Sequence, residues 1–190
     1  MPTVSTPTVR EERPSNANVV GTIPSAIAAY VTQVEECGNG AVRQTRVYVS
    51  GLPVTLADNG SNGSGGVKFY DFPKGGICAL GGGSKLTIAY GSVTDPNLIG
   101  SIGSTTAGAD GTLTTTEITF GASTTAATVS GVGTLAITPN PAIANLNGTG
   151  TAAGAFFNLA TSSDPGTNNA VTATGYLELT WINHGDITLA

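Results

Sequence analysis

The sequence predicts an all-β protein: a single β-sandwich, of the jelly-roll type, preceded by an extended N-terminal arm. Short runs of β-branched and aromatic residues alternate with glycine-rich breaks along the chain, and no firm helix is indicated. Charged residues make up only 10% of the chain, against about 25% in a typical domain. At 190 residues the chain fits one domain, which we place at 26–190 after an arm at 1–25.

Residues 1–25 are expected to form the arm because Pro2, Pro7, Pro14 and Pro24 forbid a long helix and withhold strand hydrogen bonds. A frayed tail is one interpretation of such a segment. The interpretation we prefer is a strap that orders on a neighbouring subunit. The residues expected to bind that partner are Val4, Val9, Arg10, Arg13, Val19, Val20 and Ile23.

The segment 26–36, which opens the body, has two interpretations. Ser25 could cap a short helix that begins at Ala26. Residues 30–35 suit a strand, however, and an Asn-Gly turn after them favours a hairpin with residues 43–50. A strand is therefore preferred for the whole segment.

Residues 52–90 are the stretch around which the rest of the chain is organised. Their β-prone runs are separated by glycine-rich breaks, where positive φ angles reverse a chain without a Cβ clash. The break at 81–83 predicts one such reversal. The strands expected here are 54–56, 67–72, 77–80 and 86–90.

The second half of the chain continues the alternation of strands and loops and ends in the clearest strand, 171–182. Apolar and polar residues alternate there, and Trp181 lies on the face expected to be buried. We expect Trp181→Ala to lower the free energy of unfolding by roughly 3–5 kcal/mol; an unchanged melting curve would refute the core placement. Before it we expect strands at 98–102, 112–120, 126–129, 132–137 and 155–160, and loops at 105–111, 145–150 and 162–169.

The charge of the chain is small and unevenly placed. All seven Lys and Arg residues lie within the first 85 residues, and the net charge is −5. A nucleic-acid partner is not expected, because phosphate binding needs clustered basic residues. No apolar run reaches the roughly 18 residues of a membrane helix, and the N-terminus lacks the pattern of a secretory signal. We expect no membrane partner and synthesis in the cytoplasm. A charge-poor surface suits close packing against other proteins, or it is simply a neutral sandwich surface.

The chemistry-bearing residues do not form a catalytic pattern. His184 is the only histidine, and no G-x-S-x-G nucleophile motif is present. Glu35 and Glu36 are adjacent, so strand geometry sends them to opposite faces. Cys37 and Cys78 would allow one disulfide, although two free cysteines, buried as small hydrophobic residues, are preferred. We therefore expect no enzymatic activity and no cofactor.

No metal site is expected either. One histidine and two cysteines do not complete a typical zinc set without carboxylates. Residues 58–63 have a loose similarity to a calcium loop, but the twelfth position is Phe69 instead of Glu, so the EF-hand interpretation fails. A looser calcium site in that loop stays open.

Aromatic residues offer one further possibility, the binding of sugars. They mostly fall within expected strands, where core or subunit contacts are the more common role. The candidates are Tyr30, Tyr48, Tyr70, Tyr90, Tyr176 and Trp181.

Four motifs resemble a group of tailed-bacteriophage virion structural proteins. They are VEECGNG at 34–40, LPVTL at 52–56, KFYDFPKG at 68–75 and LELTWIN at 177–183. The resemblance spans roughly residues 30 to 190 and leaves the arm uncovered.

The resemblance implies a capsid decoration, or cement, protein. Such a protein would be a β-rich homotrimer on the capsid surface of the virion, bound to the major capsid protein, and it carries no catalytic residues. Two alternatives stay open: a glycan-binding module of a head or tail fibre, and a tail or baseplate subunit.

Overall fold

A computed structural model describes residues 9–11, 21–39, 42–90, 98–108, 111–129, 131–162 and 169–184, and the structural statements below concern these residues. The chain is nearly all β, with 66% strand and 5% helix. Neither of its two short helices has the length or the apolar character to cross a membrane, as far as the described residues go. The all-β, sandwich-like class expected from the sequence is confirmed.

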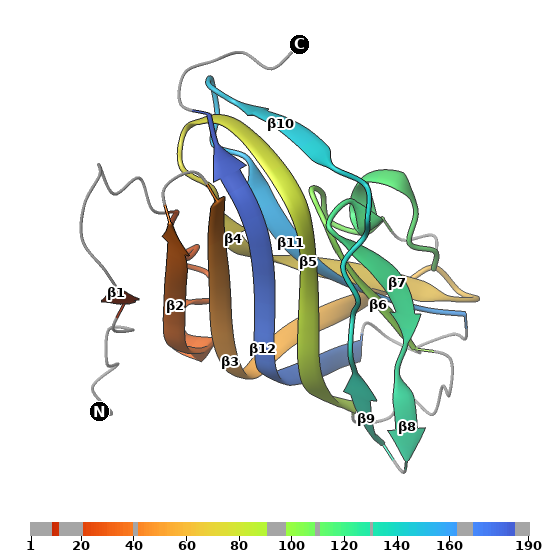
Figure 1. The fold of residues 1–190 in the computed structure, drawn as a ribbon. Coiled ribbons are helices and arrows are strands. Elements are labelled where there is room, and N and C mark those ends of the chain that lie inside the picture. Colours follow the sequence, from red (N-terminus) through yellow and green to blue (C-terminus); the bar gives the residue numbers. More distant parts are fainter. Residues whose placement is uncertain are drawn as a thin grey trace.

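The elements follow one another along the chain as strands joined by turns, with two short 3-10 helices (Figure 1). In order they are β1 Val9–Glu11, η1 Ala28–Tyr30, β2 Val31–Asn39, β3 Val42–Asp58, β4 Gly63–Asp71, β5 Gly75–Tyr90, β6 Ile99–Gly103, η2 Thr115–Ile118, β7 Gly121–Thr125, β8 Ala127–Val129, β9 Val132–Leu135, β10 Ala144–Gly148, β11 Gly154–Thr161 and β12 Asn169–Asn183.

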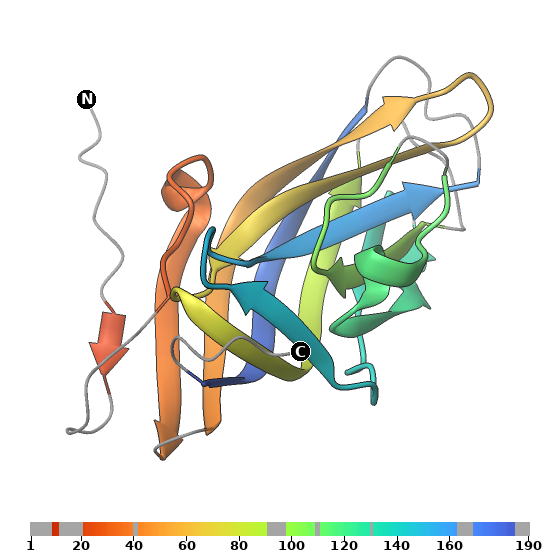
Figure 2. The ribbon, with the colours of Figure 1, turned by 90° about the horizontal axis from the view of Figure 1, so that it is seen from above.

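Two sheets share the long strand β3 (Figures 1 and 2). The larger sheet runs β1-β2-β3-β12-β5, and β9 and β10 pair with different parts of the far edge of β5. The smaller sheet runs β3-β4-β11-β6-β7, because the end of β3 turns back into β4. A bridge between Gly121 and Pro139, and a hydrogen bond from Gly82 N to Phe120 O at 2.6 Å, join the two sheets on the other side. The result is an antiparallel sheet folded into a near-barrel.

An aromatic cluster fills the centre of the near-barrel. Phe72 lies at its middle, with ring-centroid distances of 5.4 Å to Tyr70, 5.6 Å to Trp181 and 5.9 Å to Phe120. Trp181 is fully buried, and its Nε1 donates a hydrogen bond to Thr45 Oγ1 at 2.9 Å. The expected core placement of Trp181 is confirmed, and aromatic pairs of this kind add stability beyond their buried area.

The chain reversal predicted at residues 81–83 is wrong, because β5 continues through them. The positive φ expected there is present at Gly81, where φ is 140° and the register between β5 and β12 shifts. All three glycines are buried. A Cβ on Gly82 would meet Glu178 O at 3.0 Å and Phe120 Cβ at 3.2 Å, and one on Gly83 would meet Ile137 O at 3.1 Å. The glycines therefore serve close approach of neighbouring backbones at the point where the near-barrel closes.

Two other expectations are corrected by local structure. Residues 112–120 do not form a strand: they contain the helix η2, which begins with a capping box between Thr114 and Glu117. Residues 145–150 are not only a loop, since β10 pairs with the start of β5. The threonines and glycines of these segments carry weak propensities, so tertiary pairing decides their structure.

The segment 26–36 takes parts of both interpretations. Residues 28–30 form η1, and β2 begins at Val31. The preference for a strand throughout is therefore wrong for the first residues. The hairpin is confirmed, because β2 pairs antiparallel with β3 up to Asn39 and Val42.

Candidate interaction surface

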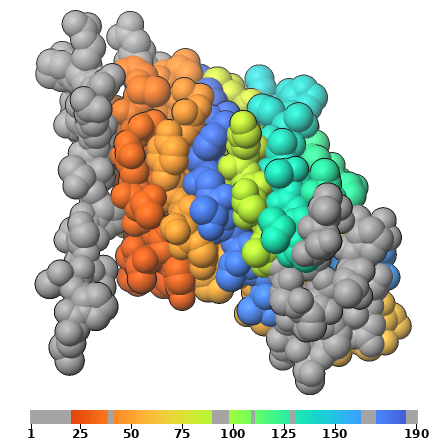
Figure 3. Space-filling model, turned by 90° about the horizontal axis from the view of Figure 1, so that it is seen from below, coloured from red at the N-terminus to blue at the C-terminus, as the bar shows by residue number. Residues whose placement is uncertain are grey.

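One face of the larger sheet turns away from the core and carries an ordered polar and aromatic cluster. Strand alternation places these side chains outward while their neighbours Val47, Leu177 and Leu179 are buried. Figure 3 shows β2, β3, β12 and β5 side by side on this face. We call the following half-buried residues the outer-face cluster: Gln33, Glu35, Arg46, Tyr48, Tyr176 and Glu178.

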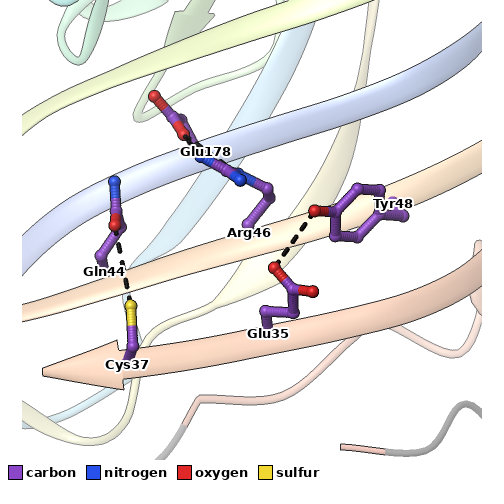
Figure 4. Close-up of polar contacts among 6 residues, drawn as sticks. All are labelled: Glu35, Cys37, Gln44, Arg46, Tyr48 and Glu178. Atoms are coloured by element: carbon purple, nitrogen blue, oxygen red, sulfur yellow. Dashed lines mark hydrogen bonds and ion pairs between the residues drawn. The ribbon is translucent and has the colours of Figure 1, made fainter. Parts of the chain in front are cut away.

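Arg46 is the centre of the outer-face cluster (Figure 4). Its Nη2 and Nε donate to Glu178 Oε2 at 2.8 and 3.2 Å, across the β3–β12 pair. Its guanidinium also lies 4.6 Å from the centroid of the Tyr176 ring. The hydrogen bond with Glu178, followed by that with Tyr48, raises the pKa of Arg46 above its usual range. The guanidinium is thus held as a fixed cation in the middle of the sheet.

Glu35 extends the cluster to β2. Its Oε2 accepts a hydrogen bond from the Tyr48 hydroxyl at 3.1 Å, and its Oε1 accepts one from Gln33 Nε2 at 2.8 Å. The ring of Tyr48 lies 5.9 Å from that of Tyr176, inclined by 58°. Tyrosine and arginine held in this way are the residue types enriched at the centres of protein–protein interfaces.

The two cysteines lie on different strands of the same sheet. Cys37 is exposed on β2, where its Sγ lies 3.7 Å from Gln44 Oε1, and Cys78 is half-buried on β5. The strands β3 and β12 lie between them. Three strand spacings amount to roughly 14 Å, whereas a disulfide needs Cα atoms within about 7 Å. Both cysteines are free, as the preferred interpretation expected, but the expectation that they are buried is wrong, because Cys37 is exposed and Cys78 is only half-buried.

The predicted partner-binding residues of the arm are only partly within the described residues. Val4, Arg13, Val19 and Val20 lie outside them. Val9 and Arg10 belong to β1, at register positions opposite Val34 and Glu35 of β2. Ile23 packs against the protein's own core instead of facing outward.

The point where the arm joins the body is firmly held. Gly21 N donates to the Tyr70 hydroxyl at 3.0 Å, and Thr22 exchanges two backbone hydrogen bonds of 2.8 Å with Asp71. A Cβ on Gly21 would lie 2.3 Å from Tyr70 Cζ, so only glycine fits here. We call residues 21 and 22 the arm root.

A buried polar network connects the arm root to the core. The Tyr70 hydroxyl donates to Glu36 Oε1 and accepts from Thr45 Oγ1 at 3.4 Å. Glu36 is only 7% exposed, whereas its neighbour Glu35 lies on the outer face, so the expectation that they occupy opposite faces is confirmed. Burial, together with the nearby charge of Glu36, raises the pKa of Tyr70 well above its usual range. Sequence reasoning missed this network because nothing local connects Gly21 to Tyr70.

The remaining candidate residues take structural roles. In the loop 58–63, Asp58 Oδ1 accepts a hydrogen bond from Gly60 N at 2.6 Å, and Asn59 Oδ1 accepts from Ser61 N and Asn62 N. These are Asx-type turn contacts. His184 is exposed and its backbone N donates to Gly76 O. Within the described ranges, no three His, Cys, Asp or Glu residues gather closely enough to hold a metal ion.

Comparisons with protein-family models, curated proteins and solved structures return no match to this chain. The resemblance to tailed-phage structural proteins therefore rests on its four motifs. Two of them occupy scaffold positions: KFYDFPKG forms the end of β4 and the turn into β5, and LELTWIN forms the last half of β12. The motifs contribute buried residues such as Trp181 to the core, and they also contribute Glu35 and Glu178 to the outer-face cluster.

Proposed function

We propose that this chain is a non-enzymatic decoration protein of a phage capsid, one that binds the outer head surface and stabilises contacts between major capsid subunits. The observation that supports this most is an arm that adds a strand to the edge of a sheet. β1 extends the larger sheet beside β2, while the arm root is fixed to the body by Tyr70 and Asp71. Strand addition binds through main-chain hydrogen bonds, which suits assembly between subunits.

The outer-face cluster supports the same proposal. It begins on β2, the strand with which β1 pairs. Arg46 and Tyr176 are ordered before any partner binds, because Glu178 and Tyr48 already hold them. Preordered side chains lose less conformational entropy on binding.

Deletion of residues 2–20 tests the arm. Truncated and full-length protein are added to heads that lack the decoration protein, and their occupancy is measured on purified particles. We expect the truncation to abolish or weaken binding, with the body still folded. Undiminished occupancy would remove the arm from the proposal.

In intact particles, mass spectrometry should find the chain at an abundance comparable to that of the major capsid protein. A few copies per particle would place it on the tail or a fibre.

Arg46→Ala tests the outer face, with Lys74→Ala as the matched control. Lys74 is an exposed cation in the turn between β4 and β5, whereas Arg46 connects β3 to β12 on the outer face. A loss of head occupancy with Arg46→Ala alone would place the contact on the outer-face cluster. Equal occupancy of both variants would show that the face is not part of the contact.

A glycan-binding module is the second candidate, and the half-buried pair Tyr48 and Tyr176 is the observation that favours it. Sugars stack on open aromatic rings, but the guanidinium of Arg46 already lies over the Tyr176 ring. That geometry favours a protein partner. Binding to host polysaccharide that is lost in Tyr176→Ala, with no binding to heads, would establish the glycan function instead.

A further inference from the structure

β1, the segment that covers the edge of β2, is weakly paired with it. β1 pairs with β2 only from Val9 opposite Val34 to Glu11 opposite Glu36. The pairing is parallel, which is slightly less stable per residue than antiparallel pairing. In the part of the chain that the structure describes, no other strand lies on this edge of β2. An edge of this kind is a template for a further strand.

The described residues on either side of 12–20 lie near each other in one subunit. β1 ends at the register position of Glu36, and Gly21 N binds the Tyr70 hydroxyl, which itself donates to Glu36. Nine residues span up to roughly 30 Å when extended, which is also long enough to reach a neighbouring subunit.

We propose that β2 is the receiving strand for β1 of a second copy of this chain, so that subunits exchange their arms. The occupant is the same segment that lies on β2 within one subunit, and exchange of identical elements is a low-cost route to a closed oligomer. The arm root stays on its own body, held by Tyr70 and Asp71, and residues 12–20 cross to the neighbour. This deepens the proposed function and rests on its assembly arm.

Cysteine crosslinking tests the exchange in the full-length protein. Cys37 and Cys78 are first changed to Ser, and Arg10→Cys and Glu35→Cys are then introduced together. These positions are register partners on β1 and β2. Oxidation should give disulfide-linked oligomers on a non-reducing gel if arms are exchanged. Arg10→Cys with Thr87→Cys is the matched control, since Thr87 is exposed on β5, away from the arm, and should give no linked species.

Mixing the single variants separates the two arrangements. The Arg10→Cys and Glu35→Cys proteins, each on the cysteine-free background, are refolded together, and a disulfide between the two chains is possible only if an arm crosses. Reactivity of Glu35→Cys with a thiol dye confirms that the position is accessible. A linked heterodimer supports the exchange. A double variant that is entirely monomeric, whether internally linked or unlinked, overturns it.

The arm exchange and the decoration function can fail independently of each other. If arms stay on their own bodies but deletion of residues 2–20 still removes the protein from heads, the exchange is wrong and the decoration function stands. If arms are exchanged but the oligomer does not bind heads, the oligomer is correct and the decoration function is wrong.

Discussion

A single hydroxyl, that of Tyr70, connects three parts of the molecule. It contacts Glu36 of β2, Thr45 of β3 and Gly21 of the arm root. Glu36 and Thr45 are both buried. A buried acceptor or donor that loses its partner costs more than the hydrogen bond itself contributes, because water cannot replace the partner.

Tyr70→Phe should therefore lower the free energy of unfolding by about 1–3 kcal/mol. Urea unfolding followed by the fluorescence of Trp181 measures it. Tyr48→Phe is the matched control, because its hydroxyl also donates to a glutamate, Glu35, but on the half-exposed outer face. We expect that change to cost less than about 1 kcal/mol. Equal losses in the two variants would contradict the role assigned to the buried network.

The raised pKa of Tyr70 predicts a specific loss of stability in alkali. Burial and the charge of Glu36 keep the hydroxyl protonated in the folded state. In the unfolded chain it titrates near its usual pKa of about 10. Its contribution is thus complete below pH about 10 and is lost above it, because the unfolded state then binds fewer protons.

The free energy of unfolding, measured against pH above 10, should therefore fall more steeply for the native protein than for Tyr70→Phe. Parallel curves would show that Tyr70 titrates normally in the fold.

The alternation of β2 was enough to predict that Glu35 and Glu36 face opposite ways. It did not predict that Tyr70 would meet Gly21, because that contact joins residues 49 positions apart.

At the scale of elements, glycine is the residue whose local pattern was most misleading. A run of glycines usually marks a turn, yet residues 81–83 lie inside β5. The reason is tertiary: the backbones of β5, β7 and the segment around Ile137 meet there. The threonine-rich β7 escaped prediction for a related cause, since its strand character comes from pairing with β6.

Gly121→Ala tests this joint between the two sheets. An added Cβ would lie 2.6 Å from Ile137 Cγ2 and 2.9 Å from Gly82 O. Overpacking of this kind costs about 1–3 kcal/mol. Gly108→Ala is the control, because nothing lies within 4 Å of its added Cβ, and its effect should stay within about 0.5 kcal/mol. Equal changes in the melting temperatures of the two variants would show that the joint does not hold the near-barrel together.

At the scale of the whole molecule, the arm and the body should be thermodynamically separate. Deleting residues 2–20 leaves the Gly21–Tyr70 hydrogen bond and the aromatic cluster in place. We expect the free energy of unfolding of the monomer to change by no more than about 0.5 kcal/mol. A large loss, measured under conditions in which both proteins are monomeric, would show that the arm belongs to the core.

The last strand of the chain, unlike the arm, is an integral part of the folded body. β12 was the clearest prediction from the sequence, because its alternation extends over the whole strand and includes Trp181. The sequence contained no sign of its neighbours, β3 and β5, which pair with it on either side. Alternation within one strand reports which face is buried, whereas strand order depends on residues more than 100 positions away, as Arg46 and Glu178 show.

A chain ending at residue 162 should therefore fail to fold, since without β12 neither β3 nor β5 has its inner partner. Circular dichroism should show no cooperative thermal transition. Adding a peptide of residues 169–190 should restore it, and because Trp181 is the only tryptophan, its emission should shift to the blue as the peptide inserts. Trp181→Phe in the peptide controls for the fluorescence signal. If the truncated chain unfolds cooperatively at the midpoint of the intact protein, β12 is an accessory strand that the fold does not require.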